Sequence, residues 1–66
     1  MARFHIFLVG SSHGVDVELA ARDLSELRED LLHDRYLQGH MEQPDEKGVC
    51  AGVLIPASRL QMVLEL

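Results

Sequence analysis

The chain has 66 residues, of which 47% are hydrophobic and 26% charged, and its formal net charge is −5. Disordered chains are poor in apolar residues, so this composition excludes a disordered protein. An acidic protein repels the phosphate backbone of nucleic acids. The only cysteine, Cys50, excludes an intrachain disulfide and a thiolate zinc site. We therefore expect a single domain, residues 1–66, without a cofactor and without a nucleic-acid partner.

The apolar segments are too short to act as membrane anchors or targeting signals. Residues 4–9 form a run shorter than a signal peptide requires, and no stretch approaches the roughly 20 apolar residues of a spanning helix. We therefore expect a cytoplasmic protein without membrane contact. A lone free thiol agrees with a reducing compartment, and we expect Cys50 to be buried and inert on a strand.

The first third of the chain predicts a β-hairpin. Residues 3–9 and 15–20 alternate apolar and polar side chains, and the segment Gly10-Ser11-Ser12-His13-Gly14 between them has turn composition. That segment lacks the lysine of a phosphate-binding loop, so we interpret it as a simple hairpin loop. A loop from Gly10 to His13 predicts five cross-strand pairs: Leu8–Val15, Ile6–Val17, Phe4–Leu19, His5–Glu18 and Phe7–Asp16.

A helix is predicted to follow, because Asp23 can accept the backbone N–H of Glu26 and Glu26 can reach back to the N–H of Asp23. We expect about three turns, ending near Asp34-Arg35. Four leucines at helical spacing form the predicted buried stripe: Leu24, Leu27, Leu31 and Leu32. Arg28 falls on the same face, where its aliphatic stem can pack.

Three more strands are predicted at residues 35–43, 49–55 and 60–66. The first of these could instead extend the helix to Gln38 with Gly39 as its cap, but the leucine stripe stops before it and favours a strand. Turns are expected around Pro44 and Gly48, and again at residues 56–59. In the last strand one face would carry Leu60, Met62, Leu64 and Leu66.

The resulting fold is α+β, with the order ββαβββ and an antiparallel sheet that is open or barrel-like. Strands 3–9 and 49–55 are apolar on both faces, whereas one amphipathic helix packed on the sheet covers one face only. The second face therefore predicts self-association, as a dimer or a larger homo-oligomer. The predicted subunit contact consists of Phe7, Val9, Val53, Ile55, Met62 and Leu64.

The leading functional prediction is a homo-oligomeric binding or regulatory module, with a further protein partner left open. We favour a non-enzymatic role, since no catalytic constellation stands out. One alternative is a nucleic-acid-binding protein, which would need its arginines to converge on one face. The other alternative is a metal or ligand site at a subunit interface, built from His5, His13 or His40, although no histidine pair has a recognised ligand spacing. The pattern of a strand, then Ile-Pro-Ala-Ser-Arg, then an amphipathic strand is common in small bacterial β-rich proteins, and it carries no catalytic residue.

Overall fold

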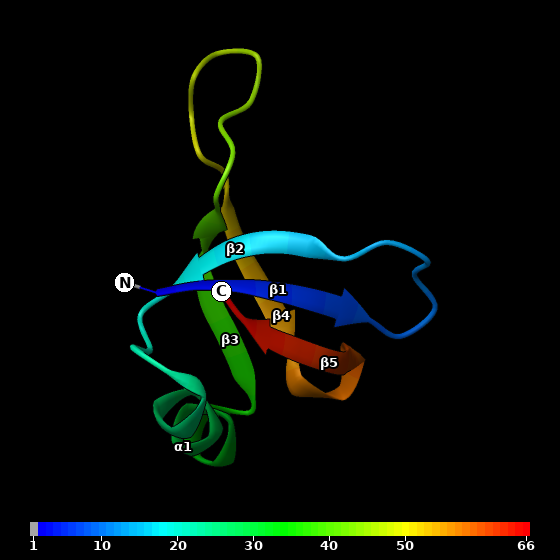
Figure 1. The fold of residues 1–66 in the computed structure, drawn as a ribbon, viewed down its shortest axis with the longest axis vertical. Coiled ribbons are helices and arrows are strands. Elements are labelled where there is room, and N and C mark those ends of the chain that lie inside the picture. Colours follow the sequence, from blue (N-terminus) through cyan, green and yellow to red (C-terminus); the bar gives the residue numbers. More distant parts are fainter. Residues whose placement is uncertain (1) are drawn as a thin grey trace.

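A computed structural model describes residues 2–66, which form one antiparallel sheet and one helix. The elements in chain order are β1 (Ala2–Leu8), β2 (Val15–Leu19), α1 (Leu24–Asp34), β3 (Tyr36–Met41), β4 (Gly52–Pro56), the 3₁₀ turn η1 (Ala57–Arg59) and β5 (Leu60–Glu65). In space the strands are ordered β4-β3-β2-β1-β5 (Figure 1). The predicted α+β fold and the ββαβββ order are confirmed. The sheet is open and not a closed barrel, although only η1 connects its two edge strands.

The core lies on one face of the sheet, called here the inner face. Its centre consists of alternating residues of β1 and β2, which are at most 1% exposed. The buried side chains are Phe4, Ile6, Val17, Leu19, Ala21, Leu27, Leu37 and Ile55. All of them are apolar, so the core of the described chain depends on packing and not on buried polar networks.

The β1–β2 register differs from the prediction by two residues. Phe4 lies opposite Val17, and His5 lies opposite Asp16. The loop takes up more residues than predicted, because β1 ends at Leu8 and β2 begins only at Val15. A shift of two keeps every side chain on its face, so the apolar pattern alone could not distinguish the two registers.

The helix begins at the predicted cap. The backbone N–H of Glu26 donates to Asp23 Oδ1 at 2.9 Å. The predicted return bond from the Glu26 side chain to Asp23 is not among the bonds observed. That carboxylate instead accepts from Arg22 Nε at 3.0 Å, and this hydrogen bond raises the pKa of Arg22 above its usual value. The N-terminus of α1 is therefore stabilised by one half of a capping box.

Only part of the leucine stripe is buried. Leu27 is 3% exposed, whereas Leu24 and Leu32 are 44% and 67% exposed. The reason is the position of α1, which packs beside β3 at one end of the sheet and does not lie across its whole face (Figure 1). The prediction that all four leucines are buried is therefore wrong for Leu24 and Leu32.

The helix ends at Arg35, which adopts a left-handed conformation with φ of 61° and donates its N–H to the carbonyl of Leu31. β3 starts directly afterwards at Tyr36. The strand prediction for this segment is thus confirmed, and the alternative of a helix extended to Gln38 is wrong. The left-handed turn brings Leu37 into the core.

Arg35→Gly is expected to stabilise the protein by about 0.5–1 kcal/mol, because glycine adopts positive φ without the steric cost that a side chain imposes. The measurement is urea-induced unfolding followed by circular dichroism. Arg35→Ala is the matched control, since it removes the same side chain but keeps the strained backbone. Equal stability of the two variants would contradict the expectation.

The β3–β4 loop projects from the body of the protein (Figure 1). Asp45 Oδ1 organises it by accepting the N–H groups of Lys47 and Val49 at 2.8 and 3.0 Å, and Gly48 has the predicted positive φ, 78°. Because residues 49–51 belong to this loop, β4 starts later than predicted. Cys50 is therefore exposed, which corrects the prediction of a buried thiol.

A β-bulge in β5 changes which of its side chains share a face of the sheet. Leu60 lies opposite Leu8 on the inner face, whereas Met62 lies opposite Phe7 on the other, outer face. The extra residue reverses the alternation, because two residues of the bulged strand then oppose one on its partner. Leu60 therefore does not share a face with Met62 and Leu64, as the sequence had predicted.

Candidate interaction surface

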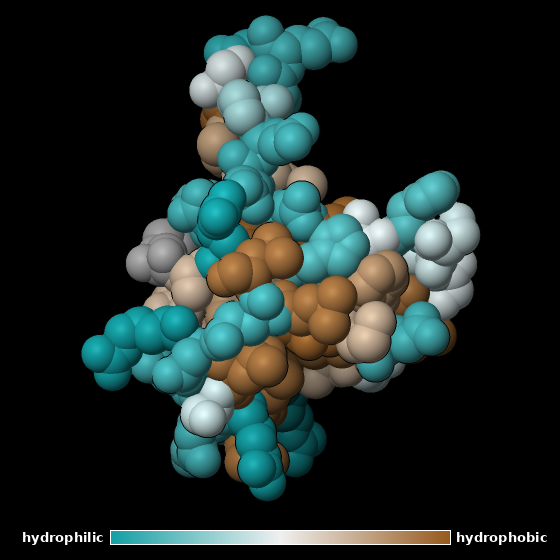
Figure 2. Space-filling model, in the orientation of Figure 1, coloured by the Kyte–Doolittle hydropathy of each residue, from teal (hydrophilic) through white to brown (hydrophobic). Residues whose placement is uncertain are grey.

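An exposed apolar patch lies where β1 and β5 meet on the outer face. Met62 and Leu64 are 47% and 43% exposed, and Phe7 is half-buried directly opposite Met62. Leu66, 60% exposed, continues the row at the chain end. Figure 2 shows apolar surface at the centre of the view, where Figure 1 places β1 and β5. We call Phe7, Met62, Leu64 and Leu66 the β5 patch.

The other predicted contact residues lie elsewhere. Val9 is 53% exposed, but it lies in the β1–β2 loop, where its N–H donates to the carbonyl of Arg59. Ile55 is only 7% exposed and belongs to the core, and Val53 packs against it. Ile55 therefore offers little surface to a second chain, because this face of β4 is the inner face.

An apolar groove of about 280 Å³ lies between α1 and β5, and sequence reasoning missed it. It is lined by Leu24, Leu27, Arg28, Leu31, Leu32 and Val63. The carboxylate of Glu65 holds the two walls together, since it accepts the backbone N–H of Leu24 at 2.9 Å. The leucine spacing was a signal for this surface, but the pattern assigned Leu24 and Leu32 to the core.

The predicted histidines lie in three different environments. His5 lies on the outer face, with Nδ1 2.5 Å from Asp16 Oδ1 and its ring edge-on to Phe7 at a centroid distance of 4.8 Å. His40, on β3, lies on the same outer face of the sheet, opposite Glu18 of β2. His13 is exposed in the hairpin loop. The sheet thus brings His5 and His40 to one face, on strands separated by β2.

An ion pair connects β1 to the end of β3 near these histidines. Arg3 spans β2 to bind Glu42 Oε1 at 2.9 Å, while Glu42 Oε2 is buried without a hydrogen-bond partner. Within residues 2–66, no three His, Cys, Asp or Glu side chains lie close enough together to hold a metal ion. A metal bound by these histidines would therefore need ligands from a second chain, as the interface-site prediction assumes.

Two of the arginines that a nucleic-acid-binding surface would need are already paired. Arg3 binds Glu42 and Arg22 binds Glu26. A guanidinium that is already paired with a carboxylate attracts a phosphate group more weakly than an unpaired one, because the carboxylate neutralises its charge. The arginine pattern therefore gives less support to nucleic-acid binding than the sequence allowed.

Gly14→Ala is expected to displace His5. A Cβ at position 14 would overlap the His5 ring, so the ring must leave Asp16. The loss of this contact should cost about 1 kcal/mol in the free energy of unfolding. Chemical denaturation of Gly14→Ala, His5→Ala and the double variant tests the coupling. We expect Gly14→Ala to be nearly neutral when His5 is already alanine, and an equal cost in both backgrounds would contradict this mechanism.

The fold and the surface together define a small α+β protein with an open antiparallel sheet and an apolar edge strand. In comparisons with known proteins, no family model, curated protein or solved structure matches the chain. In the part of the chain that the structure describes, no helix is long and apolar enough to span a membrane.

Proposed function

We propose that the protein is a self-associating binding module, in which the free edge of β5 pairs with β5 of a second copy of the chain. The observation that carries this proposal is the exposed apolar row of Met62, Leu64 and Leu66 on an edge strand. Large apolar side chains gathered on a strand edge are a recognised sign of pairing with another chain.

The small size of the chain supports association. A folded monomer of 7.4 kDa is expected to expose roughly 4200 Å², whereas this chain exposes 4819 Å². The excess is consistent with the projecting β3–β4 loop and with the incompletely covered sheet. Burying part of this surface in a dimer would supply the stabilisation that other small domains gain from disulfides or metals.

The backbone of β5 is suited to accept another strand. Leu66 donates its N–H to the carbonyl of Arg3. Because ladder groups alternate along an antiparallel strand, Val63 and Glu65 turn their N–H and C=O groups to the free edge. Protected edge strands carry lysine or proline, and β5 contains neither.

The side chains of β5 are self-complementary in an antiparallel pair. With a two-fold axis at Val63, Met62 would lie opposite Leu64 of the partner subunit, and Gln61 opposite Glu65 of the partner subunit. Cross-strand apolar pairs of this kind stabilise sheets, and no like charges would face each other. The result would be one continuous sheet across the two subunits.

A stable dimer usually buries about 800 Å² per subunit, which is roughly a sixth of the surface of this chain. A strand edge alone contributes less than that. The β5 patch on one side and the α1–β5 groove on the other would add the remaining area, because both border the free edge. In this arrangement the partner strand fills the groove beside Leu24 and Leu32.

Multi-angle light scattering over a range of protein concentrations tests the proposal. We expect a mass of twice 7.4 kDa at high concentration, falling to 7.4 kDa on dilution. A mass of 7.4 kDa at all concentrations would sink the proposal. A larger ring would also contradict it, because a two-fold contact between identical edges closes at two subunits.

A further inference from the structure

The groove between α1 and β5 is apolar and open to a ligand. Four leucines, Arg28 and Val63 line it. Leu24 and Leu32 are 44% and 67% exposed, and Leu31 and Val63 are half-buried, so a ligand can reach these walls from solvent. The volume of about 280 Å³ lies just below the range of about 300–1,000 Å³ that ligand sites occupy. A ligand of this groove must therefore be small and mostly apolar.

Arg28 gives the groove a positive charge that nothing nearby neutralises. Within residues 2–66 it is the one charged side chain in the lining, and no carboxylate lies within ion-pair distance of its guanidinium. A helical residue meets the residues three and four positions away, which here are Leu24, Ser25, Leu31 and Leu32. None of these is acidic, whereas Arg22 pairs with Glu26 at the same spacing. The groove thus attracts an anion, although the net charge of the chain is −5.

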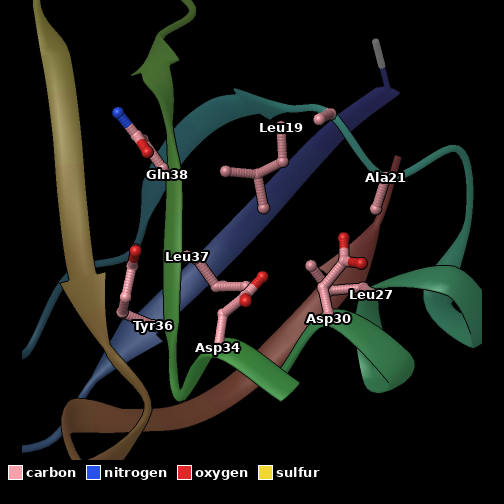
Figure 3. A pocket seen from close by; sticks show the side chains of 9 residues that line it. Leu19, Ala21, Leu27, Asp30, Asp34, Tyr36, Leu37 and Gln38 are labelled. Carbon is pink, nitrogen blue, oxygen red and sulfur yellow. The ribbon is translucent and has the colours of Figure 1, made fainter. Parts of the chain in front are cut away.

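Two acidic residues of α1 lie on another flank of the helix. Asp30 and Asp34 line a hollow between α1 and β3 (Figure 3). The apolar side chains behind that hollow, Leu19 and Leu37, are 1% and 3% exposed, so it offers a ligand little apolar surface. A small apolar anion would be repelled from this hollow and attracted by Arg28. Charge therefore selects the α1–β5 groove for such a ligand.

We infer that the α1–β5 groove binds a small carboxylate on a short alkyl chain. The carboxylate accepts two N–H groups of the Arg28 guanidinium, whose fork geometry matches the two carboxylate oxygens. The alkyl chain lies against Leu24, Leu32 and Val63. An alkylammonium ion would be repelled by Arg28, and an inorganic anion would gain nothing from the apolar walls.

The carboxylate also regulates the proposed dimer, and this part of the inference rests on the proposed function. The partner strand fills the same groove, so ligand and partner exclude each other. The dimer supplies Arg28 with no counter-charge from β5, because the Glu65 carboxylate accepts the N–H of Leu24 within its own subunit. The ligand therefore makes an ion pair that the dimer lacks, and it favours the monomer by mass action.

An NMR titration of the ¹⁵N-labelled Leu64→Gln variant with octanoate tests binding. This neutral substitution on the outer face weakens the proposed contact and leaves the groove free. We expect saturable shifts at α1 and Val63, with octanol bound at least about fivefold more weakly and octylammonium more weakly still. From butanoate to octanoate, affinity should rise about two- to fourfold for each methylene. No saturable octanoate binding, or equal binding of octylammonium, would overturn the inference.

Variants locate the site. Arg28→Gln is expected to weaken octanoate binding at least about fivefold but to leave octanol binding unchanged, so the lost affinity cannot reflect unfolding. Arg59→Gln is the matched control, since it removes the same charge outside the groove and should bind octanoate normally. Leu32→Gln should weaken both octanoate and octanol. Equal effects of Arg28→Gln and Arg59→Gln on octanoate binding would refute the assignment.

Light scattering separates this inference from the proposed function. At concentrations where the wild-type mass is twice 7.4 kDa, saturating octanoate should reduce it to 7.4 kDa, whereas Arg28→Gln should stay dimeric at the same octanoate concentration. A wild-type protein that is monomeric without octanoate but binds it at α1 would sink the dimer and support the groove site. A dimer that persists although octanoate saturates the Leu64→Gln variant would overturn the regulatory part.

Discussion

Leu64→Lys is expected to reduce the mass of the protein in solution from twice 7.4 kDa to 7.4 kDa, with a dissociation constant raised at least about 100-fold. Leu64 is 43% exposed on the outer face of β5, where the proposed two-fold contact buries it against Met62 of the partner subunit. A lysine there must give up part of its hydration without gaining a carboxylate partner. A symmetric interface contains each substitution twice, so the cost is doubled.

Leu54→Lys is the matched control for this prediction. Leu54 is also a leucine on a strand at the edge of the sheet, and it is more exposed than Leu64, at 65%. It lies on β4, however, at the opposite edge from β5. We expect this variant to keep the dimeric mass in light scattering. A folded Leu64→Lys protein that remains dimeric, or a monomeric Leu54→Lys protein, would show that β5 is not the contact.

Gly39→Ala is expected to destabilise the protein by about 3 kcal/mol, which is much of the 3–5 kcal/mol that a core of this size supplies. Gly39 lies on β3 opposite Leu19, and a Cβ there would overlap the backbone carbonyl of Glu18 and approach Leu19 Cδ2 to 2.7 Å. The backbone of β2 cannot move aside without breaking the ladder in the centre of the sheet. The urea midpoint should therefore fall steeply.

Gly52→Ala, on the neighbouring strand β4, is expected to change the free energy of unfolding in the opposite direction. A Cβ at this position would have no neighbour closer than the Gly39 carbonyl oxygen at 3.9 Å, and no positive φ is required. Alanine should then stabilise β4 by about 0.5–1 kcal/mol, because a strand glycine loses more conformational freedom on folding. Urea unfolding of both variants checks the pair. Similar effects of the two substitutions would contradict the steric argument for Gly39.

The elements themselves could be predicted well, because short-range patterns specify them. Period-two alternation located β1, β2 and β3, and the Asp23 cap located the start of α1. The end of the helix was also predictable, since polar residues interrupt the leucine spacing there. The start of β4 was not, because Val49 and Cys50 look like strand residues but belong to a loop that the Asp45 carboxylate organises.

The candidate surface was predictable in part. Met62, Leu64 and Phe7 were predicted as contact residues and form one exposed patch, and the shared face of His5 and His40 follows from alternation. Leu24 and Leu32 were assigned to the core, since a helical pattern gives the direction of an apolar face but not the extent of the surface that meets it. A hollow lined by Leu19, Leu37 and Asp34 had no sequence signal, because it lies where the β2–β3 ladder ends.

The sequence by itself determined the order of the elements, the faces on which the residues of β1, β2 and β3 lie, and the cap of α1. These features depend on residues a few positions apart, whose spacing is fixed by the geometry of helices and strands. Only the tertiary structure decided the hairpin register, the bulge in β5, the exposure of Leu24 and Leu32 and the open edge of the sheet. Each of these depends on how distant segments share space, because registers two residues apart, or a helix placed over the end or the middle of a sheet, have the same local pattern.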